Sequence, residues 1–270
     1  MTLTSQTDVA DALGVCLVQT APHWHDPQAN RQLFDHWFDR VPDAAEIVVL
    51  PEMFSTGFTM ASKEQAEPID GPTTRWLVAA AHKLGKTLCG SVVIARDDSG
   101  ERFANRLLWV TPQGEVTHYD KRHRFRMAGE HQHYDAGEER VVVVRRGVRI
   151  LLQVCYDLRF PVFARNRGDY DVYLLVANWP AVRQQHWQTL LAARAIENQC
   201  YVVAVNRTGT DGNDVHYRGG STIYGYDGEV NERLVDREGL VSGHLDMAAQ
   251  RAYREEFPAW QDADAFTIDC

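Results

Sequence analysis

The chain has 270 residues, of which 44% are hydrophobic and 24% are charged, so it is long enough to fold as one large α/β enzyme domain with a sizeable core. Its formal net charge of −9 argues against a general nucleic-acid-binding protein, because such proteins bind by neutralising phosphates. No apolar run of about 18 residues is present, so we expect no transmembrane helix and no membrane partner.

The N-terminal segment and the cysteines both favour a cytoplasmic protein. Residues 1–12 are polar, lack the apolar centre of a secretory signal, and are expected to form a loose tail. The five cysteines are an odd number without close spacing, which is typical of reduced thiols. Cys16, Cys89 and Cys200 lie in apolar runs and are expected in the core, whereas the terminal Cys270 is expected to be exposed.

Strands and helices alternate along the chain. An apolar strand at residues 15–19 precedes an amphipathic helix at 30–40 and a buried strand at 46–50. The later elements, in chain order, are a helix that opens at 71–73 and stops at Gly85, a strand at 87–95, a hairpin at 105–116, two strands within 139–155, a strand at 171–177, a helix at 186–199, a strand at 200–206, a hairpin at 221–230 and a helix at 247–256. Because no linker, repeat or low-complexity tract interrupts them, we expect a single domain over residues 1–270, with two sheets covered by helices on both outer faces.

Three chemically reactive side chains each follow a strand-like run: Glu52, Lys121 and Cys155. The ends of strands are where α/β proteins present such groups. Apolar neighbours, among them Phe58, indicate a partly dry place for Glu52, where the pKa of a carboxyl rises toward the range of a general base. The glutamate could take the thiol proton, and the lysine could stabilise first the thiolate and then an oxyanion. Together they could make a thiol hydrolase without histidine.

The thiol of Cys155 also has a plainer interpretation. A single cysteine after a strand is more often an inert core residue than a nucleophile. The helical segment that we expect to open at Pro161 offers N–H donors and a partial positive charge, both of which favour a thiolate. The accompanying Glu52 and Lys121 shift the interpretation from core packing to catalysis.

The sequence resembles the nitrilase superfamily of carbon–nitrogen hydrolases. Its three signatures occur here in the family's order, as Pro51-Glu52, the segment from Tyr119 to His123, and the run from Cys155 to Pro161. The runs at 176–180 and 193–199 extend the likeness over nearly the whole chain, and the segment 121–130 resembles the bacterial omega-amidase branch. The resemblance implies a four-layer α-β-β-α sandwich of the nitrilase type, with chains paired into a homodimer or a larger homo-oligomer.

The resemblance also assigns roles. It implies that Cys155 is the nucleophile, that Glu52 is the general base and acid, and that Lys121 faces the oxyanion with the backbone N–H of Tyr156 as a second donor. Glu130 matches a second family glutamate that positions the lysine or the substrate, although a surface acid is the alternative. Asn178 and Trp179 follow a strand and are expected to line the pocket, with a purely structural Trp as the alternative.

The omega-amidase branch implies a small dicarboxylate monoamide as substrate, either 2-oxoglutaramate or 2-oxosuccinamate, cleaved to acid and ammonia through a cysteine thioester. Up to four positive side chains at residues 121–126 favour such an anion in a chain of net charge −9. The substrate carboxylate calls for a cation, best supplied by a bidentate Arg. The candidates for substrate binding are Phe58, Arg124, Arg126, Arg159, Asn178, Trp179 and Arg183.

Other functions stay open at this stage. Within the superfamily the alternatives are a deaminated-glutathione amidase, a carbamoylase and a true nitrilase, whose chemistry up to the thioester is shared. A non-catalytic binding protein on the same fold would be expected to have a damaged triad. The histidine pairs 23/25 and 131/133 could be metal ligands on one face of a strand, but neither has a third ligand at a recognised spacing. We therefore expect no metal, and the absence of a Gly-x-Gly-x-x-Gly or P-loop run predicts no nucleotide cofactor.

Overall fold

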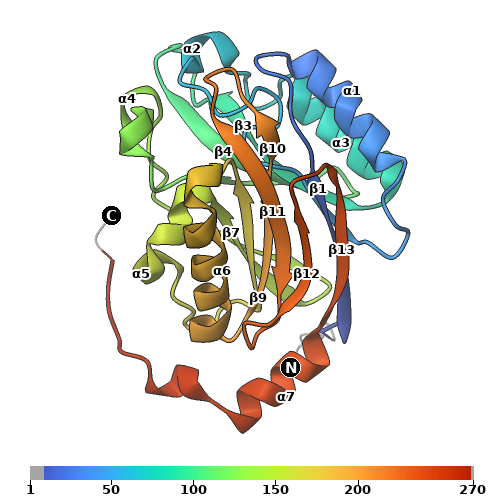
Figure 1. Ribbon diagram of the computed structural model, residues 1–270, viewed down its shortest axis with the longest axis vertical. Helices are drawn as coiled ribbons and strands as arrows, with labels where there is room; N and C mark the ends of the chain where they lie inside the picture. Colours follow the sequence, from blue (N-terminus) through green and yellow to red (C-terminus); the bar gives the residue numbers. More distant parts are fainter. Residues whose placement is uncertain (1–8, 269–270) are drawn as a thin grey trace, which may run out of the picture.

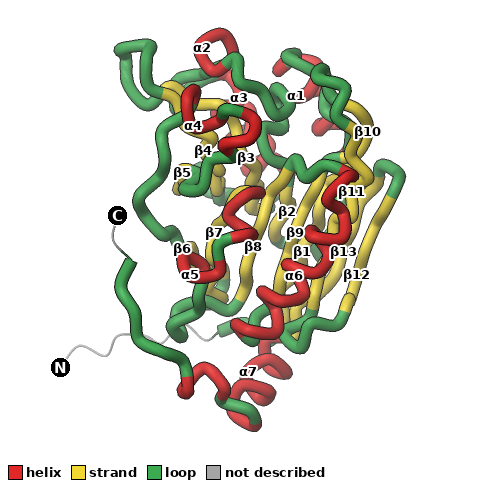
Figure 2. The backbone as a smooth tube through the Cα atoms, turned by 60° about the vertical axis from the view of Figure 1, so that its left-hand side comes forward, coloured by secondary structure: helices red, strands yellow, loops and turns green. Residues whose placement is uncertain are grey.

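Two β-sheets form the centre of the molecule, as the computed structural model shows for residues 9–268 (Figures 1 and 2). The first sheet has six strands in the order β13-β1-β2-β3-β4-β5, and the second has seven, in the order β10-β11-β9-β8-β7-β6 with β12 on β11. Strands β1, β2 and β3 run parallel, as do β7, β8 and β9. The bounds of the first sheet are β1 Ala12–Gln19, β2 Ile47–Val49, β3 Thr87–Ala95, β4 Phe103–Val110, β5 Val116–Asp120 and β13 Gly239–Asp246. Those of the second are β6 Val142–Arg145, β7 Val148–Val154, β8 Val172–Ala177, β9 Tyr201–Asn206, β10 Thr208–Thr210, β11 His216–Tyr224 and β12 Val230–Val235.

The helices cover the outer faces of the two sheets, α1 and α3 on one side and α6 on the other (Figure 1). The longer helices are α1 Pro27–Phe38, α3 Pro72–Leu84, α6 Gln184–Asn198 and α7 Met247–Glu256. The short ones are α2 Ser62–Gln65, α4 Glu130–His133, α5 Pro161–Ala164 and the 3-10 turns η1 Arg126–Ala128, η2 Cys155–Arg159, η3 Ala181–Arg183 and η4 Ala259–Asp262. None of the helices within residues 9–268 combines the length and the apolar character that crossing a bilayer requires.

The alternation of side chains along the strands explains the layers. In β1, Val15 and Leu17 belong to the large apolar core between the sheets, whereas Val18 packs with Phe34 and Leu77 under α1 and α3. Both faces of these strands are therefore buried, which is why they are apolar throughout. This confirms the predicted α-β-β-α sandwich.

The terminal parts of the chain differ from the sequence-based expectation. Strand β13 was not predicted, yet all eight of its residues pair antiparallel with β1. The end of the expected loose tail is fixed, because Ala10 donates a backbone hydrogen bond to Arg146, Asp11 accepts one from Met247, and Ala12 begins β1. Residues 1–8 of that tail, and the terminal Cys270, lie outside the described residues. The three cysteines expected in the core, Cys16, Cys89 and Cys200, are buried.

Candidate active site

The three reactive side chains come together where strands from both sheets end. Glu52 lies three residues past β2, Lys121 directly follows β5, and Cys155 directly follows β7. The Nζ of Lys121 is 2.8 Å from Glu52 Oε1, and both side chains are almost completely buried. Lys121 and Cys155 line the same cavity. The fold thus brings together one residue from each of the three signature segments.

Every oxygen of the Glu52 carboxylate is held by a donor. Oε1 accepts hydrogen bonds from Lys121 Nζ at 2.8 Å and from Asn105 Nδ2 at 2.7 Å. Oε2 accepts one from the backbone N–H of Asn178 at 2.8 Å. The Nδ2 of Asn178 also donates to the backbone carbonyl of Glu52 at 2.6 Å. The carboxylate is thus fixed in position from three elements, β4, β5 and the end of β8.

A second buried acid shares the lysine. Glu130, at the start of α4, accepts hydrogen bonds from Lys121 Nζ at 2.9 and 3.0 Å and one from the backbone N–H of Phe125. Burial alone would lower the pKa of Lys121, but the charges of Glu130 and Glu52 outweigh it and raise that pKa above the usual range. Burial raises the pKa of Glu130 against the opposing pull of Lys121. The lysine therefore stays positively charged at neutral pH.

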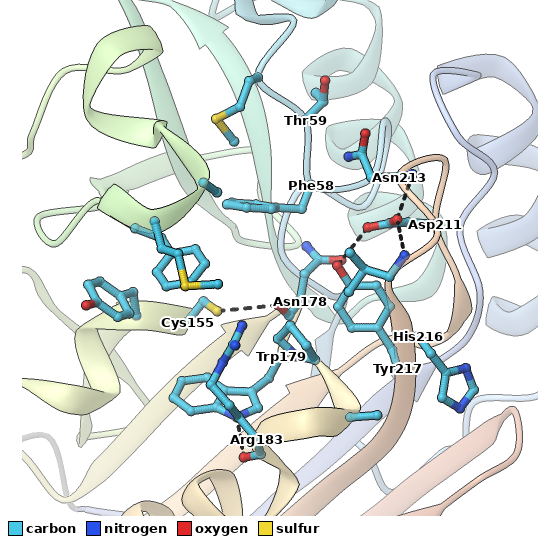
Figure 3. A pocket seen from close by; sticks show the side chains of 18 of the residues that line it. Phe58, Thr59, Cys155, Asn178, Trp179, Arg183, Asp211, Asn213, His216 and Tyr217 are labelled. Atoms are coloured by element: carbon cyan, nitrogen blue, oxygen red, sulfur yellow. Dashed lines mark hydrogen bonds between the residues drawn. The ribbon is translucent and has the colours of Figure 1, made fainter.

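Cys155 occupies a strained turn and carries a neutral thiol at rest. Its φ of 43° lies in the left-handed region, which a residue with a Cβ adopts only when its surroundings hold it there. Burial raises the pKa of the thiol well above its ordinary value, the charge of Glu52 raises it further, and Lys121 opposes both. Its Sγ donates a hydrogen bond to the backbone oxygen of Asn178 at 3.8 Å (Figure 3).

The expected stabilisation of a thiolate by the following helix was wrong. The helix that opens at Pro161 is α5, which has only four residues and begins six residues after Cys155. Such a short helix, so far along the chain, leaves burial as the dominant influence on the thiol.

A buried carboxylate ties the lysine and cysteine segments together. Asp157 accepts hydrogen bonds from the backbone N–H of Val154 at 2.9 Å and from the hydroxyl of Tyr119 at 2.8 Å. It also bonds the backbone N–H of His123 at 3.0 Å and its Nδ1 at 2.7 Å. Asp157 is fully buried, so its loss could not be compensated by water. Its role was not predicted, although it lies in the signature run from Cys155 to Pro161.

A cavity of about 1040 Å³ opens above these groups. The residues predicted to face it that do so are Phe58, Tyr156, Arg159, Asn178, Trp179 and Arg183. Glu52 and Glu130 lie behind Lys121 and do not line it. Its far wall, seen in Figure 3 around Asp211 and Tyr217, comes from the turn between β10 and β11 and was not predicted. The tryptophan and histidine at 24 and 25, between β1 and α1, also line the cavity.

Of the basic side chains at residues 121–126, Lys121 lines the cavity and the others do not. Arg124 is directed to the backbone oxygen of Tyr134 at 3.1 Å, and Arg126 is exposed on η1; neither lines the cavity. His123 is bound to Asp157. The expectation that up to four positive side chains of this segment face the substrate was therefore wrong, because Arg124 is held by the backbone of Tyr134 and Arg126 lies on the surface.

Neither histidine pair belongs to a group of three possible metal ligands in the part of the chain that the structure describes. His131 and His133 lie in helix α4, where alternate residues do not share a face as they would on a strand. His25 Nε2 lies 2.8 Å from Thr59 Oγ1. Between residues 9 and 268 there is no group of three His, Cys, Asp or Glu side chains with the arrangement of a metal site.

Comparison with known proteins agrees with this geometry. Residues 14–255 match the family model of carbon-nitrogen hydrolases. The chain is 48% identical over 257 residues to "Omega-amidase YafV" of Escherichia coli (strain K12). This match covers 95% of this chain and 98% of that protein. It is 32% identical to the "2-oxoglutaramate amidase" of Bacillus subtilis (strain 168), over 87% of this chain and 92% of that one.

A solved structure shows the same fold. A CN-hydrolase superfamily protein from Xanthomonas campestris, crystallised with an arsenic adduct in its active site, has 43% sequence identity and a TM-score of 0.93. The match covers 96% of this chain and 100% of that chain. The chain belongs to the carbon–nitrogen hydrolase family, the nitrilase superfamily, within its omega-amidase branch.

Proposed function

We propose that this protein is an amidohydrolase that cleaves the terminal amide of a small dicarboxylate monoamide, 2-oxoglutaramate or 2-oxosuccinamate, to acid and ammonia. The observation that carries the proposal is the buried contact between Glu52 and Lys121 at 2.8 Å, together with the cavity that both Lys121 and Cys155 line. Relatives described as an omega-amidase and a 2-oxoglutaramate amidase support the substrate class. We propose Cys155, Glu52 and Lys121 as the catalytic residues.

In the acylation half of the reaction, Glu52 takes the proton of Cys155 as Sγ forms a bond to the amide carbon. Because burial raises the pKa of the thiol, attack requires that a base remove its proton, and Glu52 is the proposed acceptor. The ammonium of Lys121 and the backbone N–H of Tyr156 stabilise the oxyanion. Glu52 then gives its proton to the leaving nitrogen, the carbon–nitrogen bond breaks, and ammonia departs from the thioester. Glu130 keeps Lys121 charged and in place.

In the second half, Glu52 removes a proton from water while the water oxygen attacks the thioester. The carbon–sulfur bond breaks, the acid leaves, and the proton returns from Glu52 to Cys155. The same carboxylate serves both halves, which is consistent with its fixed position between three donors.

Arg159 and Arg183 are the proposed ligands of the substrate carboxylate. Both line the cavity, and the contacts of their guanidinium groups within the described part of the chain are to rings rather than to carboxylates. Arg159 lies over Trp179, with Nη2 3.1 Å from His186 Nδ1, and Arg183 lies over Phe125. A guanidinium without an acidic partner is available to bind a substrate anion.

Ammonia release across a panel of amides tests the proposal. The panel holds 2-oxoglutaramate, 2-oxosuccinamate, neutral butyramide, deaminated glutathione, an N-carbamoyl amino acid and a nitrile. We expect kcat/KM for the 2-oxo amides to exceed that for butyramide by about 10- to 150-fold, the value of a charged hydrogen bond. One of the two variants Arg159→Ala and Arg183→Ala should remove the preference, so that kcat/KM becomes similar for the 2-oxo amides and butyramide. Arg124→Ala and Arg126→Ala should leave the preference unchanged. Equal kcat/KM for charged and neutral amides would refute the substrate assignment.

The free cysteines favour a reducing compartment. The four described cysteines, Cys16, Cys89, Cys155 and Cys200, are all unpaired and buried. We propose that the protein works in the cytoplasm as a homodimer or a larger homo-oligomer, the assembly that the sequence resemblance implies. Light scattering on the purified protein tests the assembly, and a monomeric mass would refute it.

A further inference from the structure

Asn178 stands between the base and the nucleophile, directly after β8. Its backbone N–H holds Glu52 Oε2 at 2.8 Å, and its Nδ2 donates to the Glu52 carbonyl at 2.6 Å. Its own backbone carbonyl accepts a hydrogen bond from Cys155 Sγ at 3.8 Å (Figure 3). Only 4% of Asn178 is exposed, and the residue lines the cavity. Three of its polar groups are therefore committed to the catalytic pair.

The fourth polar group of this residue is left over. Asn178 Oδ1 is buried and has no hydrogen-bond partner among the described residues. The amide cannot be turned around to satisfy it, because Oδ1 would then meet the Glu52 carbonyl and Glu52 Oε2, which are both acceptors. A buried acceptor without a donor is unfavourable unless a ligand supplies the donor.

We propose that Asn178 Oδ1 accepts a hydrogen bond from the N–H of the scissile amide of the substrate. The inference rests on the proposed amidase function and assigns the part of that site which recognises the leaving group. A primary amide brings N–H donors to this acceptor, whereas an ester brings none. When the nitrogen takes its proton from Glu52 it becomes a stronger donor, so the contact strengthens as the carbon–nitrogen bond breaks. Asn178 thereby selects amides over esters of the same acid.

The experiment compares two substrates that give the same thioester and the same acid: 2-oxoglutaramate and 5-methyl 2-oxoglutarate. Formation of 2-oxoglutarate is measured for both, and the ratio of their kcat/KM values is the readout. Asn178→Ala should lower that amide-to-ester ratio about 10- to 100-fold, because the leaving-group contact is lost for the amide alone. Any disturbance of Glu52 affects both substrates and cancels in the ratio.

Two further variants keep the result interpretable. Asn178→Asp retains an oxygen at the Oδ1 position but replaces the Nδ2 donor by a charged oxygen beside Glu52, so activity on both substrates should fall while the ratio stays near the wild-type value. Asn105→Ala is the matched control, because Asn105 Nδ2 also holds Glu52 and its Oδ1 is also unpartnered, yet it does not line the cavity. It should slow both substrates equally.

The outcomes separate this inference from the function on which it rests. An unchanged ratio in Asn178→Ala, with a wild type that hydrolyses 2-oxoglutaramate, would overturn the role of Oδ1 and leave the amidase intact. A wild type without amidase activity would refute the proposed function itself. If Asn178→Ala does not fold, Asn178→Ser provides the same comparison, since its short side chain also lacks the Oδ1 acceptor.

Discussion

Lys121 is the single cation between two buried carboxylates, so Lys121→Met should destabilise the fold in a pH-dependent way. Glu52 and Glu130 lie 2.8 and 2.9 Å from its Nζ, and all three side chains are at most 1% exposed. Removing one partner of a buried ion pair costs about 3–5 kcal/mol of unfolding free energy. The isosteric methionine fills the same space, so this loss is electrostatic rather than a packing defect.

The pH dependence follows from the two carboxylates left facing each other. One of them takes up a proton, and the pKa of the pair in the folded variant then lies above the ordinary value for Glu of about 4.3. A raised folded-state pKa means that the folded variant gains stability as the pH falls through that pKa toward 4.3. The stability deficit of Lys121→Met, that is, its loss of unfolding free energy relative to wild type, should therefore shrink on acidification, by at most about 1.4 kcal/mol per pH unit.

Urea unfolding followed by circular dichroism at pH 5.5, 7.0 and 8.5 measures this deficit. We expect it to be smaller at pH 5.5 than at pH 8.5 by at least about 1 kcal/mol. Lys86→Met is the matched control, because the buried Lys86 donates to the backbone oxygens of Asp43 and Ala45 rather than to acids. Its deficit should be constant over this range. A deficit for Lys121→Met that is absent, or as constant as that of Lys86→Met, would refute the reasoning.

Further predictions concern the chemistry of the site. Cys155→Ala should abolish turnover and keep the fold, and a purified variant with about a tenth of wild-type activity would disprove the nucleophile assignment. Lys121→Met should also lower kcat by about 100- to 1,000-fold through the lost oxyanion charge; a change of less than about 10-fold would remove that role. Asp157→Asn places an amide NH₂ against groups that are themselves donors, so kcat should fall about 100-fold with little change in KM. Asp171→Asn is the control, because it weakens a buried contact with Arg149 and Arg254 at the other end of β8. It should lower the melting temperature but preserve kcat. Equal losses of kcat in Asp157→Asn and Asp171→Asn would contradict a positioning role for Asp157. A chelator should leave ammonia release unchanged, and activity lost with chelator and restored by zinc would refute the Glu-Lys-Cys mechanism.

The layers and the convergence of Glu52, Lys121 and Cys155 were predictable because both depend on local patterns. Buried strands are continuous apolar runs, and the predicted bounds of β3 agree with the observed Thr87–Ala95. Glu52, Lys121 and Cys155 each stand just beyond a strand, in segments with recognisable signatures. Asn105 was missed as a partner of Glu52, although an asparagine inside a mostly apolar strand such as β4 is a signal that could have been read.

What could not be predicted depends on pairing between distant segments. The arginines at 124 and 126 look like a single basic patch in the sequence, but the backbone oxygen of Tyr134 and the surface position of η1 take them away from the cavity. The far wall at 211–217 carries no motif and reaches the site only because β11 pairs with β9. Charge counted along a chain ignores such partners, which explains the wrong prediction of a local positive field.

The pairing of β1 with β13 has a consequence for how the protein is made. Gln19 faces Gly239, so about 220 residues must be added to the nascent chain before the first strand can acquire this neighbour. At translation rates of about 5–20 residues per second, the apolar edge of β1 stays unpaired for about 10–45 seconds. Ribosome-bound chains that end before residue 239 should therefore be aggregation-prone and dependent on chaperones. Substitutions in β13 should consequently reduce the yield of folded protein far more than the activity of the molecules that complete folding.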